Sequence, residues 1–393
     1  MNPAFVYRLG ADTRIVFALG KCLPHTAQLP QAKYLISTSL PGPFMPRTTK
    51  NSPRQDVHTV AKLAKVSIAT VSRVINHKPS VDPAIADRVW KAIKKLNYHP
   101  NYGARAMVSG RSHMLGLLVS RITNPFFPEL IEGFEQIASI NGFEIMISAV
   151  GQQPGYGQEA VRRMLSRNVE GAAIMTHGMS AADLEEFKIY GTPLVFIDAA
   201  PAPDLGSVVQ LDYENGIRDA VQHLAVLGHR RIWFISGPLD RCSSTLRQQA
   251  FIKAMEEIGV LNAAAQCIAG DHTLEGAIRA ADILFQKAPT AVICSNDLTA
   301  VSVLRKAAEK KLQVPSQLSV IGFDDIDLAK FVSPPLTTVS VDRYRLAQAA
   351  FHSLMQRLAD PQTLPPLQLL PVRLVVRQST SYAPSAAQEL PPL

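Results

Sequence analysis

The first sustained hydrophobic pattern of the chain begins at residue 56. Apolar residues recur there at helical spacing in two short runs separated by about four residues, and then in a third, longer run. The runs comprise Val60, Leu63 and Ala64, then Val71, Val74 and Ile75, then Ile85, Val89, Ile93 and Leu96. Ser67 is placed to cap the second helix, and Asp82 and Pro83 are a cap and a first helical residue for the third. The pattern predicts three helices within about forty residues.

From residue 111 onward, short apolar runs alternate with amphipathic stretches, which is typical of parallel β-strands joined by crossover helices. Strands are predicted at Leu115–Val119, Phe143–Ser148, Ala172–Met175, Leu194–Ile197, Ile232–Ile235, Ala291–Cys294 and Ser319–Gly322. Long helices are predicted at Pro125–Ile140, Tyr156–Arg167, Ile217–Leu227, Leu246–Ile258, Leu274–Gln286 and Leu298–Lys311. These strands and helices are too many to pack around one small hydrophobic core, so we expect two α/β lobes.

The two ends of the chain lack such periodicity. Residues 1–55 contain seven prolines and no helix or strand pattern, so we assign them no fold and expect either disorder or a start of translation at Met45. Residues 379–393 are interpreted as a flexible tail that lacks the leucine heptads of a coiled coil. The expected order is the extension at 1–55, a helical headpiece at 56–100, a hinge or linker at 101–112, a two-lobed body at 113–378 and the tail at 379–393.

Charge is distributed unevenly along the chain. Of the net charge of +8, residues 1–55 carry +6, residues 56–110 carry +6 and residues 111–393 carry −4. A basic front joined to a mildly acidic body is typical of a polyanion-binding module attached to a regulatory or ligand-binding body. A solvated basic tail is the alternative, and charge alone does not separate the two.

Composition excludes several classes of protein. No run approaches the roughly 18 consecutive apolar residues that a membrane-spanning helix needs. The four cysteines are too sparse for a disulfide framework and too far apart for a zinc site. Arg8, Asp12 and Arg14 interrupt the region where a secretory signal needs an apolar stretch. The sequence therefore predicts a cytoplasmic protein.

The segment from Val57 to Pro83 has the spacing of a helix-turn-helix unit, whose second helix enters the major groove of DNA. Its apolar positions point inward, which leaves a polar face for DNA. Arg73 can donate two hydrogen bonds to a guanine edge, hydroxyl groups can reach phosphates, and Ile68 or Ala69 can touch a thymine methyl. The predicted DNA-binding residues here are Ser67, Ile68, Ala69, Thr70, Ser72, Arg73 and Asn76. A three-helix protein-interaction domain is the alternative.

Longer stretches of the chain resemble the LacI/GalR family of bacterial transcription regulators. They are VAKLAKVSIATVSRVIN, LNYHPNYGARAM, NPFF, LVFID, LGHRRIWFISGP, SNDLTA and VIGFDD, and the resemblance covers residues 56 to about 378. It implies a helix-turn-helix headpiece, a hinge helix, and a body similar to periplasmic sugar-binding proteins in which a small effector binds between two lobes. It further implies a homodimer on a pseudo-palindromic double-stranded operator, acting as a repressor.

The hinge and one turn depart from the family pattern. Met107 stands where the family usually has leucine, and with Ala104 it is expected to contact the minor groove as an apolar wedge. This segment is too short to form a helix alone, so we expect it to order on DNA, with a plain linker as the alternative. Lys65 occupies a turn position where the family commonly has glycine or asparagine, which suit positive φ.

Polar residues follow several predicted strands of the body, at the edge where parallel sheets bind ligands. The resemblance assigns effector binding to Arg247 and Asp324 and an aromatic wall to Phe126 and Phe127, while Asp297 is interpreted as a helix cap. The predicted effector-binding residues are Phe126, Phe127, Asp198, Arg241, Ser243, Arg247, His272, Asn296 and Asp324. Carboxylates, an amide and an arginine beside an aromatic face suit a sugar or another polyol.

Other functions remain as alternatives. The cleft of an orphan regulator with this fold could bind a nucleobase or a protein partner. The chain could instead be a sugar-binding receptor or an enzyme, but it contains no P-loop, HExxH or GxSxG motif and no histidines at metal-ligand spacing. We expect a regulator that is not an enzyme and needs no cofactor or metal.

Overall fold

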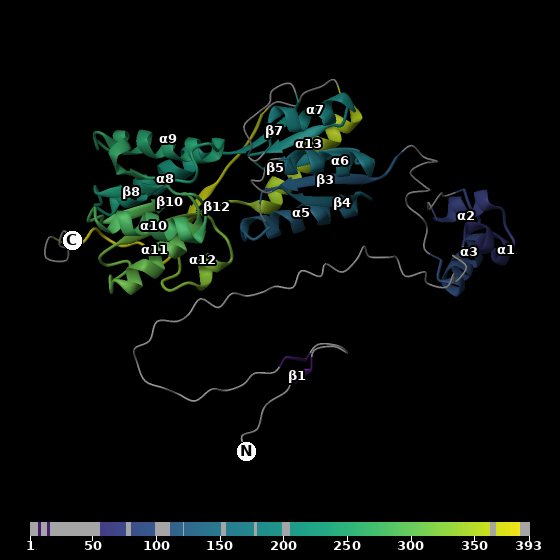
Figure 1. The fold of residues 1–393 in the computed structure, drawn as a ribbon, viewed down its shortest axis with the longest axis horizontal. Helices are drawn as coiled ribbons and strands as arrows, with labels where there is room; N and C mark the ends of the chain where they lie inside the picture. The colour runs from purple at the N-terminus through teal and green to yellow at the C-terminus, as the bar shows by residue number, and fades with distance from the viewer. Residues whose placement is uncertain are drawn as a thin grey trace, which may run out of the picture. The chain divides into compact units, whose positions relative to one another are not determined.

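The computed structural model describes residues 7–8, 14–15, 56–75, 80–98, 111–120, 122–150, 155–176, 179–198, 205–361 and 367–385 (Figure 1). The chain divides into two compact units, Met1–His99 and Pro100–Leu393. In the first unit, β1 (Tyr7–Arg8) pairs antiparallel with β2 (Arg14–Ile15). The predicted extension, including Met45, lies otherwise outside the described residues, as do the predicted hinge residues Ala104 and Met107. No helix of the described ranges is long and apolar enough to span a membrane.

The first unit contains the three predicted helices, α1 (Val57–Ala64), α2 (Ile68–Ile75) and α3 (Pro83–Leu96). Each begins at a side-chain cap that accepts a backbone N–H: Asp56 for α1, Ser67 for α2 and Asp82 for α3. Val60, Val71 and Val89 have no exposed surface and form the centre of a small apolar core. The helical spacing therefore predicted all three helices and the centre of their core, although Leu63 of the first run is 41% exposed.

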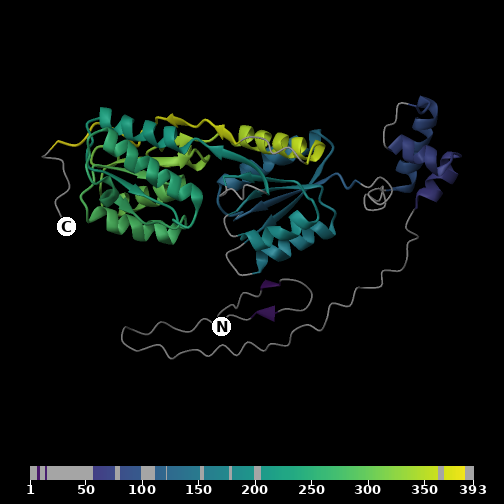
Figure 2. The ribbon, with the colours of Figure 1, turned by 90° about the horizontal axis from the view of Figure 1, so that it is seen from above.

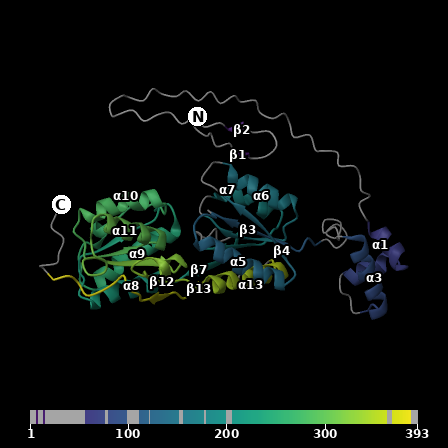
Figure 3. The ribbon, with the colours of Figure 1, turned by 90° about the horizontal axis from the view of Figure 1, so that it is seen from below.

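The second unit begins with an all-parallel sheet in the order β13-β7-β6-β5-β3-β4. Its strands are β3 (Met114–Val119), β4 (Glu144–Ala149), β5 (Gly171–Met175), β6 (Leu194–Ile197), β7 (Gly206–Leu211) and β13 (Gln368–Leu370). In Figure 3, α5 (Phe126–Ile140) and α13 (Arg343–Ala359) lie on one face of this sheet, and α6 (Tyr156–Ser166) and α7 (Ala181–Ile189) on the other. We call this the amino-terminal lobe.

The carboxy-terminal lobe contains a second sheet, in the order β14-β12-β11-β10-β8-β9, with only β14 antiparallel to its neighbour. Its strands are β8 (Ile232–Ile235), β9 (Cys267–Ile268), β10 (Ala291–Cys294), β11 (Ser319–Asp324), β12 (Thr337–Ser340) and β14 (Arg373–Val375). Helices α8 (Tyr213–Val226) and α9 (Cys242–Glu257) lie on one side, and α10 (Leu274–Phe285) and α11 (Asp297–Glu309) on the other (Figure 3). Short helices η1 (Ala263–Gln266) and α12 (Leu328–Phe331) complete it. The predicted two-lobed α/β body is confirmed.

The chain crosses between the lobes three times. It leaves β7 for α8, returns from β12 to α13, and crosses again from β13 to β14. Figure 2 shows the last two crossings, in yellow-green and yellow, running along one side of the body. Each lobe is therefore built from segments that lie far apart in the sequence.

The predicted elements agree with the structure at most of their ends and differ in a few informative places. Helices α8 and α9 begin four residues earlier than predicted, at Tyr213 and Cys242, and α8 starts there because Asp212 caps it by accepting the N–H of Asn215 at 3.2 Å. The prediction missed α7, α12, α13, β7, β9, β12, β13 and β14. Three of these five strands, β9, β13 and β14, are edge strands of only two or three residues, so their hydrophobic patterns are short.

The prediction of a flexible tail from residue 379 is wrong for residues 379–385. Ser379 has no exposed surface; its hydroxyl accepts the N–H of Thr337 at 2.8 Å and donates to the carbonyl of Val320 at 2.6 Å. Further along, the carbonyl of Ser381 contacts the His229 ring at 3.0 Å. We call residues 376–385 the C-terminal strap, because they are held along β11, β12 and the end of α8. Residues 386–393 of the predicted tail lie outside the described residues.

Candidate functional site

The first candidate site is the outer face of α2. The predicted residues Ser67, Ile68, Ala69, Ser72 and Arg73 are exposed, and Thr70 is half-buried. Ser67 keeps its capping role, and its hydroxyl lies 2.9 Å from that of Thr70. Val71 and Val74 on the opposite side are buried. The structure therefore gathers six predicted DNA-binding residues on one solvent-facing surface, while Asn76 lies outside the described residues.

The turn before α2 has the left-handed conformation of the family pattern, although it carries lysine where the family commonly has glycine or asparagine. Lys65 has φ 54° and ψ 48°, in the left-handed region, and its N–H bonds back to the end of α1. Val66 N–H donates to the carbonyl of Ala61 at 3.0 Å, which closes the helix end. A lysine thus adopts the geometry that glycine or asparagine would adopt with less strain, at a cost on the order of 1 kcal/mol.

The second candidate site is a cavity of about 390 Å³ between the two lobes. All nine residues predicted for effector binding line it: Phe126, Phe127, Asp198, Arg241, Ser243, Arg247, His272, Asn296 and Asp324. The amino-terminal lobe contributes mainly an apolar wall, in which Phe126 and Phe127 meet edge to face with ring centroids 5.8 Å apart. The carboxy-terminal lobe contributes most of the polar groups. The volume is that of a small-molecule pocket.

Arg247, which is 6% exposed, is held in place by five residues. Its guanidinium lies between the rings of Tyr213 and Phe323, at 4.6 and 4.5 Å from their centroids. Nη1 donates to the carbonyl of Ser295 at 2.5 Å, and Nη2 donates to the Tyr213 hydroxyl at 3.3 Å. The carboxylates of Asp198 and Asp324 supply the opposite charge. Among the described residues, no partner satisfies Arg247 Nε, so a buried donor remains for a ligand.

Two buried carboxylates face this arginine from opposite lobes. Burial raises the pKa of Asp198 to about 6, against the opposing effects of Arg247 and of a hydrogen bond from Tyr213. Burial raises the pKa of Asp324 to about 7, and Arg247 and Arg343 oppose that rise. Asp198 follows β6 and Asp324 ends β11, so each lies at the carboxyl end of a strand. Both acids change charge near neutral pH, which is unusual for aspartate.

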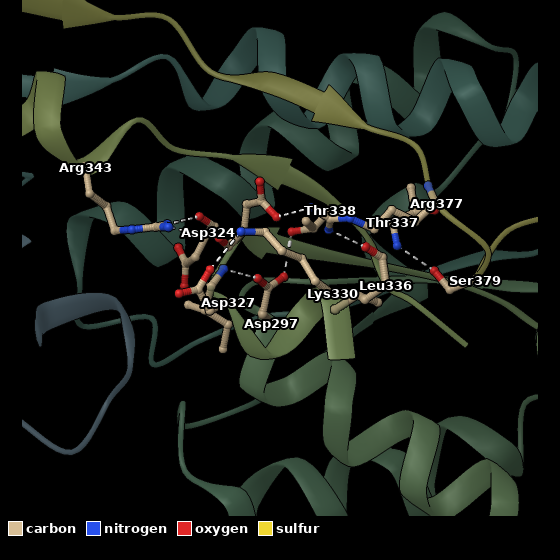
Figure 4. A network of polar contacts seen from close by, with 12 residues as sticks. Asp297, Asp324, Asp327, Lys330, Leu336, Thr337, Thr338, Arg343, Arg377 and Ser379 are labelled. Carbon is tan, nitrogen blue, oxygen red and sulfur yellow. Dashed lines mark hydrogen bonds and ion pairs between the residues drawn. The ribbon is translucent and has the colours of Figure 1, made fainter. Parts of the chain in front are cut away.

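The polar floor of the cavity corrects one prediction. Asn296, not Asp297, caps α11, and its side-chain oxygen accepts the N–H of Thr299 at 2.9 Å. Asp297 is the first residue of that helix; it is fully buried and accepts from Thr338 Oγ1 at 2.6 Å and from the N–H of Ile326 at 2.8 Å. It therefore fixes the loop after Asp324 rather than a ligand. The contact between Asp297 and Thr338 is part of the polar network of Figure 4.

That network continues to a bridge between the lobes. Arg343, the first residue of α13 in the amino-terminal lobe, donates to the carbonyls of Asp324 and Asp325 at 2.6 and 3.0 Å (Figure 4). Its Nε also donates to Glu129 of α5 at 2.7 Å. One guanidinium thus connects the end of β11 to two helices of the other lobe.

Sequence reasoning missed part of this site. Tyr213 was overlooked because it lies in the first turn of α8, which the periodicity placed one turn too late; the aspartate before it was the available signal. The lining residues that were not predicted are Ser120, Asn124, Val150, Met175, Thr176, Leu211, Pro238, Asp240, Asp271 and Thr273. Most of them lie in loops after strands, where single-sequence patterns carry little information. The described residues contain no group of three or more His, Cys, Asp or Glu able to hold a metal ion.

Comparison with known proteins agrees with this arrangement. Residues 56–101 match the family described as bacterial regulatory proteins, lacI family, and residues 221–380 match a periplasmic binding protein-like domain. The chain is 32% identical to catabolite control protein A of Priestia megaterium over 82% of this chain and 98% of that protein. The chain belongs to the lacI family of bacterial regulatory proteins.

Other members of the lacI family extend the likeness. The chain is 33% identical to the ribose operon repressor of Escherichia coli K12 over 77% of this chain and 92% of that one. A crystal structure of the lac repressor dimer bound to operator and the anti-inducer ONPF superposes with a TM-score of 0.73 and 28% identity, covering 83% of this chain and 99% of that one. Membership of a family of regulators confirms the prediction that this protein is not an enzyme.

Proposed function

We propose that this lacI-family protein is a transcriptional repressor that binds a pseudo-palindromic operator as a homodimer, and that an uncharged sugar or polyol in the cavity between its lobes sets its affinity for DNA. The observation that carries the proposal is the arrangement around Arg247. One buried arginine, two carboxylates from opposite lobes and an aromatic wall converge on a cavity of about 390 Å³. Relatives named as repressors, and one solved as an operator-bound dimer, support the DNA-binding half.

The charges of the cavity favour an uncharged ligand. Four aspartates line it, Asp198, Asp240, Asp271 and Asp324, against two arginines. Asp271 is already paired with Arg279 at 2.9 Å, which leaves Asp198 and Asp324 beside Arg247. Paired carboxylate and guanidinium groups bind vicinal hydroxyls with several hydrogen bonds, whereas a phosphate or carboxylate ligand would meet an excess of negative charge.

The headpiece reads DNA through α2 in this proposal. Arg73 is the side chain suited to a guanine edge, and Ser67 and Thr70 are placed for phosphates. A single headpiece covers only a few base pairs, so two are needed for a specific site. The contribution of Met107 in the hinge stays a prediction, as does a cytoplasmic location, the compartment in which bacterial DNA is found.

The test begins with DNA fragments that the purified full-length protein retains from a random library. The enriched sequence should be pseudo-palindromic, and binding should weaken steeply with salt. Arg73→Ala should weaken specific binding by about 5- to 100-fold, as expected for loss of a bidentate base contact. Arg247→Ala should leave operator affinity intact and abolish its response to added sugars, tested with D-ribose, D-glucose and cellobiose. Retention of no preferred sequence would contradict the DNA-binding proposal, and a response to hypoxanthine or to D-ribose 5-phosphate in place of neutral sugars would contradict the effector class.

A further inference from the structure

Tyr213 lies behind the effector cavity and does not line it. It is the first residue of α8, immediately after the chain crosses from β7 into the carboxy-terminal lobe, and it is 3% exposed. Its ring packs against Phe323 with centroids 5.6 Å apart. Phenylalanine would fill that space equally well. A buried hydroxyl costs free energy unless it is hydrogen-bonded, so the role of Tyr213 must be sought in the partners of its oxygen.

The two polar groups beside that oxygen come from different lobes. Arg247 Nη2, on α9, lies 3.3 Å from it. The carboxyl group of Asp198, which follows β6 of the amino-terminal lobe, lies near enough that it raises the pKa of Tyr213 while the tyrosine lowers that of Asp198. A guanidinium can only donate, so the tyrosine oxygen accepts from Arg247 and its single proton is free for the Asp198 carboxylate. The hydroxyl therefore joins the arginine of one lobe to the acid of the other.

The rings and the hydroxyl hold Arg247 in different ways. The rings of Tyr213 and Phe323 fix the plane of the guanidinium, because each lies about 4.5 Å from it. Stacking leaves the group free to turn within that plane. Only directional hydrogen bonds set that angle, and the ones in the described structure go to the Ser295 carbonyl and the Tyr213 hydroxyl. The direction in which the unpartnered Nε points thus depends on Tyr213.

We propose that Tyr213 is a positioning residue of the effector site, whose hydroxyl orients Arg247 for the ligand and ties it to Asp198 across the cleft. The expected effect of Tyr213 on ligand binding rests on the proposed function of the cavity as an effector site. Its structural part, the tie between the lobes, stands independently of which effector binds. Removing the hydroxyl alone should loosen Arg247 and change the environment of Asp198 while the packing of the ring remains.

The experiment compares Tyr213→Phe with wild type in the full-length protein. Tyr382→Phe serves as the matched control, because it removes the same hydroxyl from a residue that is 77% exposed and does not line the cavity. The first readout is the pH titration of the Asp198 carboxyl carbon by NMR of protein labelled with ¹³C-aspartate, with the resonance assigned by its loss in Asp198→Asn. In wild type the midpoint should lie near the pKa of about 6. Tyr213→Phe should raise it by about 0.5–1 pH unit, because it loses a hydrogen bond to the charged form.

The second readout is calorimetric titration with D-ribose, D-glucose and cellobiose. Tyr213→Phe should bind any sugar that wild type binds about 5- to 20-fold more weakly, whereas Tyr382→Phe should match wild type on both readouts. An unchanged Asp198 midpoint in Tyr213→Phe overturns the proposed tie. A shifted midpoint with unchanged sugar affinity overturns the positioning role. If wild type binds none of the three sugars, the proposed effector class fails, and the Asp198 titration still decides whether the tie exists.

Discussion

Asp324 combines two unfavourable features at one position. Its backbone has φ 112°, outside the regions that aspartate prefers, and its carboxyl group is buried. The burial is only partly offset by Arg247 and Arg343, which is why its pKa lies at about 7. A buried carboxylate whose charge is only partly compensated by the protein is available to a ligand that supplies hydroxyl donors.

This cost predicts a pH-dependent effect of Asp324→Asn. The pKa is about 3.8 when unfolded and about 7 when folded, so between these values the native state holds more protons and its stability falls as pH rises. The amide cannot ionise, and asparagine tolerates positive φ. The variant should therefore match wild type near pH 4 and exceed it at pH 8 by on the order of 2–4 kcal/mol in the free energy of unfolding.

Urea denaturation at pH 4, 6 and 8 measures this difference. Asp240→Asn is the control, because it neutralises an exposed carboxylate at the same cavity and should have little effect at any pH. A constant difference between Asp324→Asn and wild type across this range would show that the charge of Asp324 is not the cause.

The sequence predicted which residues line the cavity more accurately than it predicted the role of each of them. All nine predicted effector-site residues line it. Short apolar runs locate the strand ends at which Asp198, Asn296 and Asp324 lie, whereas Phe126, Phe127 and Arg247 were assigned through the resemblance to the family. The cap of α11 was predicted one residue too late, at Asp297 instead of Asn296, a difference that a helical period of 3.6 residues cannot resolve. Tyr213 escaped notice because its importance depends on a contact with Asp198, a residue that only the folded chain brings near.

Among the elements, the C-terminal strap is an ordered segment that the sequence pattern wrongly predicted to be flexible. Its residues alternate too little to predict a strand, yet they supply hydrogen bonds that β11 and β12 do not make with each other. The carbonyl of Ser379 accepts the N–H of Val320 at 2.8 Å, and its hydroxyl bonds to the same strand and to Thr337. In contrast, α1, α2 and α3 were predicted to within a residue or two, since caps and apolar spacing are local signals.

The strap predicts different outcomes for two truncations. Removing residues 386–393 should leave the thermal midpoint of the body unchanged within about 2 °C, because none of the described bonds is lost. Removing residues 379–393 should destabilise the body by several kcal/mol or prevent folding, since buried donors such as the Thr337 N–H lose their acceptors at about 1–3 kcal/mol each. Should the longer truncation fail to fold, Ser379→Ala gives the same test with an expected loss of about 1–3 kcal/mol. An unchanged midpoint for Ser379→Ala would contradict a structural role of the strap.

At the scale of the whole molecule, the residues next to the crossings connect one lobe to the other. Arg343, next to one crossing, bridges the lobes through Glu129 and the carbonyls of Asp324 and Asp325. Tyr213, next to another crossing, is the residue that we propose ties Arg247 to Asp198. Arg343 also lines a second, open hollow of about 750 Å³ formed by the crossings and α5. Its guanidinium contacts the backbone of Asp324, whose side chain faces the effector cavity. A ligand that moves Asp324 must therefore act on both lobes.

Arg343→Lys should weaken this coupling and leave both binding sites intact. A lysine keeps the charge but cannot span three acceptors in one plane. We expect effector affinity and operator affinity each to stay within about 3-fold of wild type. The factor by which bound effector changes operator affinity should shrink by about 3- to 10-fold. Operator titrations with and without saturating effector measure that ratio. Arg345→Lys, an exposed neighbour in the same hollow, is the control, and an undiminished ratio in Arg343→Lys would exclude the bridge as the coupling element.

The interleaving of the two lobes also sets the order in which a newly made chain can fold. The headpiece is complete once α3 ends at Leu96, and its contacts are local, so it can fold as it leaves the ribosome. Neither sheet of the body is complete until β13 and β14 have been made, the last of which ends at Val375. At about 5–20 residues per second, each nascent chain carries a folded headpiece and an unfinished body for roughly 15–55 seconds. During that interval a lone headpiece covers only a few base pairs and can hold DNA only weakly, so a half-made chain should not occupy a specific site before its body has folded.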